Sequence, residues 1–154
     1  MDNITLLYLL MHESEIIANA ISIGAQWEVW MQVEFAIIVR KTGLGVAREL
    51  PYPPPNQSQK VDCAIRDGEK IIAIELKVES ATNAGQAAGL PIETAIENDI
   101  AKIRHFTTAS DKWVIGIAYS EPVKNRFRDY AICPGNNSIY GENNGVGFLI
   151  KTVI

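Results

Sequence analysis

The stretch that decides the fold is "VDCAIRDGEKIIAIELKVES", residues 61–80. It reads as two β-strands joined at Asp67-Gly68, a dipeptide typical of tight hairpin turns. Side chains alternate between the two faces of a strand, so Glu75 and Lys77 share one face while the large aliphatic residues of "IIAIELKV" form the other. A carboxylate and an ammonium group therefore lie within a strand that is otherwise apolar.

The hairpin also brings in a third charged residue. If Asp67-Gly68 is a two-residue turn, Arg66 lies opposite Glu69, and Asp62 lies opposite Ala73. Asp62 then shares a face with Glu75 and Lys77. A change of one residue in loop length would move Asp62 to the other face.

The elements around this hairpin predict the fold class. We expect an N-terminal helix over 3–22, a second helix over about 24–42, a short strand at "VAREL", a helix from Pro91 to about Thr107, a strand at "KWVIGIAYS" and a C-terminal strand within 145–154. This order predicts an α/β (α+β) fold with a central mixed sheet flanked by helices. The length of 154 residues predicts one domain over residues 1–154.

Two further carboxylates fall on apolar helix stripes. On the second helix, Glu34 lies at the centre of the stripe formed by Trp27, Trp30, Met31 and Ile38, and on the third helix Asp99 lies among isoleucines. A buried carboxylate without a partner is costly, so each acid needs one. Lys77 can pair with one acid and Lys102 can flank Asp99, which leaves the remaining acids in need of a cation.

One divalent cation meets that need. Mg²⁺, or Mn²⁺ in its place, prefers carboxylate oxygens, water and phosphate, which suits Asp62 and Glu75 as ligands with Glu34 near them. The chemistry favoured by such a site is attack of a metal-polarised water on a phosphodiester. Lys77 would hold that water or help to deprotonate it.

These residues resemble a known family. "VD" on one strand and "ELK" on the next, after an acidic helix and before a helix reading "ENDIAKI", resemble the PD-(D/E)xK nuclease superfamily with its restriction-endonuclease-like fold. The resemblance covers about residues 24–120 and implies an αβββαβ core, here with an extra N-terminal helix. It implies that Asp62 and Glu75 bind metal, that Lys77 is the catalytic lysine and that Glu34 completes the site. The proline that precedes the aspartate in the family is Val61 here.

Basic residues indicate where a nucleic acid would bind. "VKNRFRDY" interleaves Lys124, Arg126 and Arg128 with aromatic residues, a mixture that can contact phosphates and stack on bases. Lys102 adds to the local positive charge. The alternative is that "VKNRFRDY" is a solvated amphipathic turn. A net charge of −4 argues against non-specific coating of nucleic acid.

The sequence leaves several alternatives open. The substrate is DNA or RNA, and the rival function is a catalytically inactive nuclease-like binding or immunity-type protein with a protein partner, which the acidic isoelectric point favours slightly. The first helix either packs on the domain or forms a homodimer contact. Two cysteines without metal-ligand spacing fit a reducing, cytoplasmic location, and the N-terminal apolar run is too short to span a membrane.

Overall fold

The computed structural model describes residues 1–23, 27–79 and 91–154. The helix start expected at residue 24 therefore lies outside the described residues. The elements in chain order are α1 (Asn3–His12), α2 (Ser14–Ile23), α3 (Trp27–Arg40), β1 (Gly45–Pro51), β2 (Lys60–Asp67), β3 (Lys70–Val78), α4 (Ile92–Ile103), β4 (Asp111–Ala118), α5 (Glu121–Ile132), β5 (Ser138–Asn143) and β6 (Val146–Thr152).

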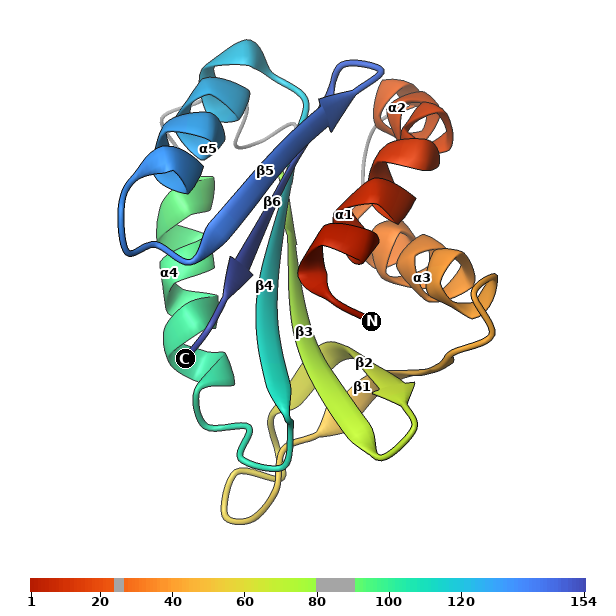
Figure 1. The fold of residues 1–154 in the computed structure, drawn as a ribbon, viewed down its shortest axis with the longest axis vertical. Coiled ribbons are helices and arrows are strands. Elements are labelled where there is room, and N and C mark those ends of the chain that lie inside the picture. The colour runs from red at the N-terminus through yellow and green to blue at the C-terminus, as the bar shows by residue number, and fades with distance from the viewer. Residues whose placement is uncertain (24–26, 80–90) are drawn as a thin grey trace.

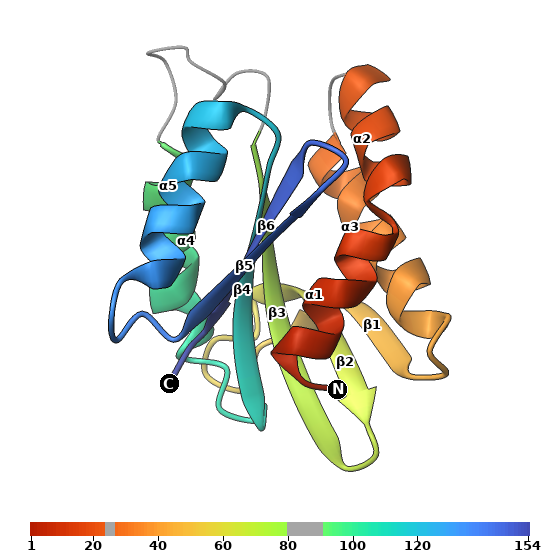
Figure 2. The ribbon, with the colours of Figure 1, turned by 45° about the horizontal axis from the view of Figure 1, so that its top comes forward.

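The six strands form one mixed sheet in the order β1-β2-β3-β4-β6-β5 (Figure 1). Only β3 and β4 pair in parallel, joined through α4, and the other neighbours are antiparallel. Helices α1, α2 and α3 cover one face, and α4 and α5 cover the other (Figure 2). This confirms the α+β class with a central mixed sheet flanked by helices. The order α3-β1-β2-β3-α4-β4 is the helix, three strands, helix and strand expected from the sequence.

Each face of the sheet carries its own hydrophobic core, because alternate residues of each strand point to opposite sides. On the α1–α3 side, Phe35 and Leu10 pack with Ile74 and Phe148. On the α4–α5 side, the isoleucines of α4 pack with Phe127 and other apolar residues. Glu75 and Lys77 of β3 therefore face α4, on the side opposite the aliphatic core of that strand.

The N-terminal segment differs from the single helix expected over 3–22. It breaks at Glu13 into α1 and α2, which meet at a bend of 60°. The hydroxyl of buried Ser14 donates a hydrogen bond of 2.6 Å to the Met11 carbonyl at the break. The bend lets α1 pack on the sheet through three buried leucines, Leu6, Leu7 and Leu10. No single helix among the described residues is long and apolar enough to cross a membrane, although α1 and α2 together reach that length and hydropathy as a bent pair.

The C-terminal part contains two elements that the sequence reading missed. The segment "VKNRFRDY", for which no helix was predicted and a solvated turn was one alternative, belongs to α5, which begins after Ser120 and buries Val123 and Phe127 at helical spacing. The turn-rich segment before the last strand contains β5, which pairs with β6 through a two-residue loop. The loop residues Asn144 and Gly145 both have positive φ, 49° and 77°, as expected for an Asn-Gly hairpin turn.

The β2–β3 hairpin has a different register from the predicted one. Asp67 pairs with Lys70 and Arg66 with Ile71, so the loop residues are Gly68 and Glu69. Gly68 has a φ of 62°, which glycine adopts without strain. The register is shifted by two residues, and a shift of two keeps every side chain on its predicted face.

Gly116 of β4 lies against α4 and α5, where no space remains for a larger side chain. A Cβ atom there would lie 2.7 Å from Phe127 Cζ and 2.9 Å from Ile96 Cδ1. Both neighbours are buried, so we expect Gly116→Ala to lower the free energy of unfolding by about 1–3 kcal/mol. In Gly45→Ala the nearest atom to the new Cβ is 3.6 Å away, so this control should change stability by less than about 0.5 kcal/mol. Urea unfolding of both variants measures the difference, and equal stabilities would contradict this account.

Candidate active site

The site forms where β2 and β3 separate. Regular pairing runs from Asp67–Lys70 to Cys63–Ile74. One residue further, this register brings Asp62 level with Glu75. There the Leu76 backbone N–H donates a 2.7 Å hydrogen bond to Asp62 Oδ2, a side-chain atom, instead of to a backbone carbonyl of β2. The two predicted metal-binding acids are therefore neighbours on adjacent strands.

Asp62 is also held from the side of α3. The Gln32 amide donates a 3.0 Å hydrogen bond to Asp62 Oδ1. Arg48 of β1 in turn donates a 3.0 Å hydrogen bond to Gln32 Oε1, which fixes the orientation of the amide. Both carboxylate oxygens of Asp62 thus have a donor, so the plane of the carboxylate is determined by the fold.

Glu75 is the most buried acid of the site, with 1% of its surface exposed. Its Oε1 accepts a 3.1 Å hydrogen bond from the Tyr52 hydroxyl and lies 2.8 Å from Lys102 Nζ. The Tyr52 ring packs edge-on against Phe106, with ring centroids 5.0 Å apart. Burial, together with the neighbouring carboxylates of Asp62 and Asp99, raises the pKa of Glu75 to about 7, against the lowering effect of Lys102.

Lys77 lies between carboxylates from two helices. Its Nζ is 3.4 Å from Asp99 Oδ2 of α4 and 3.6 Å from Glu28 Oε1 of α3. Burial by itself lowers the pKa of Lys77, but the carboxylates of Asp99 and Glu28 outweigh it and raise the pKa. Lys77 therefore remains an ammonium group, which suits donation of hydrogen bonds to water or phosphate. It does not suit the predicted alternative of taking a proton from water.

Six charged residues gather here, and we call them the acidic cluster because they carry an excess of negative charge. Four carboxylates meet two ammonium groups: Glu28, Asp62, Glu75, Asp99, Lys77 and Lys102. Burial is the largest cause that raises the pKa of both Asp99 and Glu28, and Asp62 raises both further. Asp99 Oδ2 is buried, and among the described residues it has the ion pair with Lys77 Nζ at 3.4 Å but no hydrogen bond. Fully ionised, the cluster lacks two positive charges, which is the charge of one divalent cation.

A metal site at the acidic cluster would draw two ligands from the protein in this arrangement. Within residues 1–23, 27–79 and 91–154, no three acidic, histidine or cysteine side chains are arranged to hold one ion. Asp62 and Glu75 supply two carboxylates, the number that Mg²⁺ commonly takes from a protein when water and substrate phosphate complete its shell. The excess of carboxylates over ammonium groups is consistent with a cation there.

The structure does not place Glu34 in this cluster. The buried face of α3 centres on Met31, Phe35 and Val39, which leaves Glu34 at its border. Glu34 is about 200° around the helix from Gln32. The side chains of α3 that reach the cluster are Glu28 and Gln32. The prediction for Glu34 is corrected because it relied on the tryptophans, whereas Phe35 and Val39 define the buried face.

The predicted nucleic-acid-binding residues are engaged within the protein. Lys124 has only 2% of its surface exposed and pairs with Glu121 at 2.5 Å and with Glu142 at 2.8 Å. This burial contradicts a role for Lys124 in contacting phosphates. Arg126 pairs with Glu93, and Arg128 pairs with Glu142 at 3.1 Å. Lys102 forms its ion pair with Glu75, and its charge also lowers the pKa of Asp99, as expected for a residue that flanks this acid.

Four residues of the site were missed from the sequence: Glu28, Gln32, Arg48 and Tyr52. Glu28 and Gln32 are spaced i and i+4 on α3, a detectable signal for a shared helix face. Tyr52 had no such signal, because it lies in a proline-rich segment that looks solvated. In the fold it is 1% exposed and adjoins Glu75.

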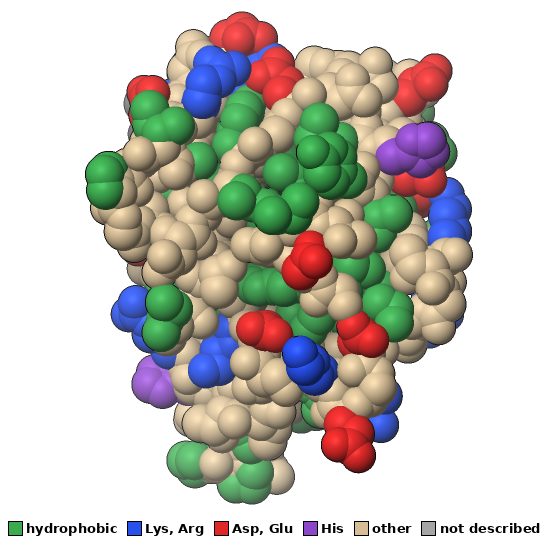
Figure 3. All heavy atoms as spheres, viewed as in Figure 1, with side chains coloured by type: hydrophobic (Ala, Val, Ile, Leu, Met, Phe, Trp, Pro, Cys, Tyr) green, Lys and Arg blue, Asp and Glu red, His purple; other side chains and the backbone are tan. Residues whose placement is uncertain are grey.

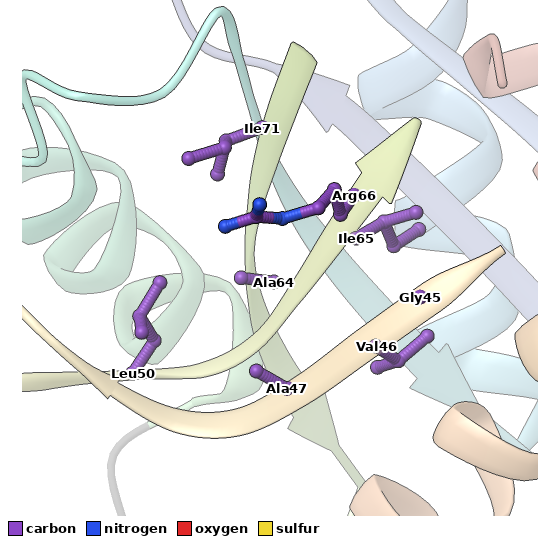
Figure 4. A pocket seen from close by; sticks show the side chains of 8 residues that line it. All are labelled: Gly45, Val46, Ala47, Leu50, Ala64, Ile65, Arg66 and Ile71. Atoms are coloured by element: carbon purple, nitrogen blue, oxygen red, sulfur yellow. The ribbon is translucent and has the colours of Figure 1, made fainter. Parts of the chain in front are cut away.

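Two surfaces away from the acidic cluster are mainly apolar. A pocket of about 260 Å³ on β1, β2 and the start of β3 is lined by Leu50, Ala64 and Ile71, with the Arg66 guanidinium beside them (Figure 4). In Figure 3, hydrophobic side chains gather over the area of α1 and β5. The exposed apolar residues of α1 include Ile4 and Tyr8. The first helix thus packs on the domain with one face and leaves another exposed, so the homodimer stays a prediction.

Comparison of the chain with protein-family models, with curated proteins and with solved structures finds no match. Function is therefore inferred from the acidic cluster itself.

Proposed function

We propose that the protein is a Mg²⁺- or Mn²⁺-dependent nuclease that hydrolyses phosphodiester bonds of DNA or RNA through a site similar to that of the PD-(D/E)xK superfamily. The observation that carries this proposal is the meeting of Asp62, Glu75 and Lys77 where β2 and β3 separate, within a cluster that has excess negative charge. Perturbed pKa values of several clustered acids are typical of functional sites.

The residues divide the work in the following way. Asp62 and Glu75 would hold the cation, with Asp62 oriented by Gln32 and by the Leu76 N–H. When bound, the cation polarises water and stabilises negative charge on the phosphate. The Lys77 ammonium group would donate hydrogen bonds to the attacking water or a phosphate oxygen, and its ion pairs with Asp99 and Glu28 keep it protonated.

A cleavage assay tests the proposal directly. Plasmid DNA, single-stranded DNA and transfer RNA would each be incubated with the protein in Mg²⁺, in Mn²⁺ or in a chelator. We expect cleavage of at least one substrate with metal and none with chelator. Intact substrates under every metal condition would contradict nuclease activity.

Metal should also stabilise the folded protein. A ligand that binds only the folded state raises its stability, so millimolar Mn²⁺ should raise the melting temperature. Asp62→Asn removes a ligand charge and should abolish this rise, whereas Glu34→Gln, on the border of α3, should leave it intact. An unchanged rise in Asp62→Asn would place the ion elsewhere.

A second candidate is a nuclease-like protein without activity that binds another protein. It is favoured by the ion pairs of Lys77 and Lys102, which neutralise half of the four carboxylates without metal. Buried ion pairs occur without catalysis. The two candidates differ in the melting experiment, because a purely structural cluster gains nothing from metal.

A further inference from the structure

Lys102 forms an ion pair with Glu75, one of the two acids proposed to bind the metal. Lys102 Nζ is 2.8 Å from Glu75 Oε1, and it contacts the acid proposed to bind metal. Lys77, by contrast, pairs with Asp99 and Glu28, neither of which we assign as a ligand. One ammonium group therefore flanks the proposed cation site, and the other occupies part of it.

We propose that Lys102 is a built-in competitor of the divalent cation: its ammonium group neutralises Glu75 in the metal-free protein and must leave before the cation binds there. The inference rests on the proposed metal site of Asp62 and Glu75. Its physical basis is repulsion between like charges. An ammonium on one oxygen of a carboxylate and a divalent cation on the other would lie a few ångströms apart, where repulsion amounts to several kcal/mol even at an effective dielectric constant of about 20.

The surroundings allow Lys102 to leave while Glu75 keeps its place. The Lys102 side chain is 33% exposed and lies in the last turn of α4, so its four-carbon stem can carry the ammonium into solvent. The second donor to Glu75 Oε1 is the neutral hydroxyl of buried Tyr52. Burial raises the pKa of Tyr52, which keeps this hydroxyl protonated. Tyr52 can therefore orient Glu75 in both states, without repelling a cation.

Competition has a consequence that distinguishes it from a supporting role. If Lys102 held Glu75 in place for the metal, removing it would weaken metal binding, as loss of outer-shell residues commonly does by 10–100-fold. If Lys102 competes, removing it strengthens binding. General damage to the fold cannot produce tighter binding, so a gain in affinity is specific.

The test is calorimetric titration of Mn²⁺ into the full chain and into Lys102→Gln. We expect Lys102→Gln to bind Mn²⁺ about tenfold more tightly, the factor that corresponds to 1.4 kcal/mol. Lys102→Arg retains the cation and should resemble wild type. The matched control is Lys70→Gln, which removes the same charge at the exposed β2–β3 turn and should leave the affinity unchanged.

Each result decides the inference. Tighter binding in Lys102→Gln alone supports competition, as does binding that is detectable only in this variant. Equal or weaker binding in Lys102→Gln, with binding lost in Asp62→Asn, overturns competition and leaves the proposed metal site standing. Absence of Mn²⁺ binding in both wild type and Lys102→Gln overturns the inference together with the metal site.

Discussion

Replacing Lys77 with methionine is expected to reduce metal-dependent cleavage by about 10²- to 10³-fold, the usual cost of removing a donor that stabilises developing charge. The reason is the position of its ammonium group beside the acids of the cluster, where Asp99 and Glu28 keep it protonated. Initial rates on the best substrate, measured at saturating Mn²⁺, would give this ratio.

Comparison with a second variant separates catalysis from metal binding. Lys77→Met should still show stabilisation by Mn²⁺, whereas Asp62→Asn should lose both cleavage and stabilisation. Melting curves would establish that both variants fold. Full activity in folded Lys77→Met would contradict the role of Lys77, even if the metal site remained intact.

Replacing Glu75 with glutamine is expected to stabilise the metal-free protein at pH 8 by roughly 2–3 kcal/mol relative to the effect of the same change at pH 5. Burial raises the pKa of Glu75 from 4.5 to about 7. Between these values the folded state binds a proton that the unfolded state has released, so wild-type stability falls as pH rises. Above about pH 7 both states are ionised, and the penalty from Glu75 stays constant. Glutamine does not ionise, so the Glu75→Gln variant does not have this penalty.

Urea unfolding of wild type and Glu75→Gln at pH 5 and pH 8, with chelator, measures this effect. The difference in unfolding free energy between the two proteins should shift in favour of the variant at pH 8. The same variant should lose stabilisation by Mn²⁺, because it lacks a charged ligand. A difference that does not change with pH would show that burial of Glu75 carries no penalty, and would weaken the case for a site built at the expense of stability.

The hairpin sequence was sufficient to bring the key charges together, and the reason is geometric. The alternation of side chains along β2 and β3 puts Asp62, Glu75 and Lys77 on one face, and this survives a register that is shifted by two residues. Asp99 was identified by its place among the isoleucines of α4 and contacts Lys77 in the fold. The prediction for Glu34 was wrong because helix periodicity identifies only an apolar stripe. Packing against other elements decides which part of that stripe is buried.

The amino-acid sequence by itself determined the α+β order, the hairpin and the shared face of Asp62, Glu75 and Lys77, because these depend on local periodicity and turn chemistry. Only the tertiary structure decided how the charges pair. Tyr52 and Lys102 reach Glu75 across long separations in the chain, Gln32 reaches Asp62, and Lys124 is buried against Glu142. Such contacts follow from how β1, α3, α4 and α5 pack on the sheet, which no local pattern records.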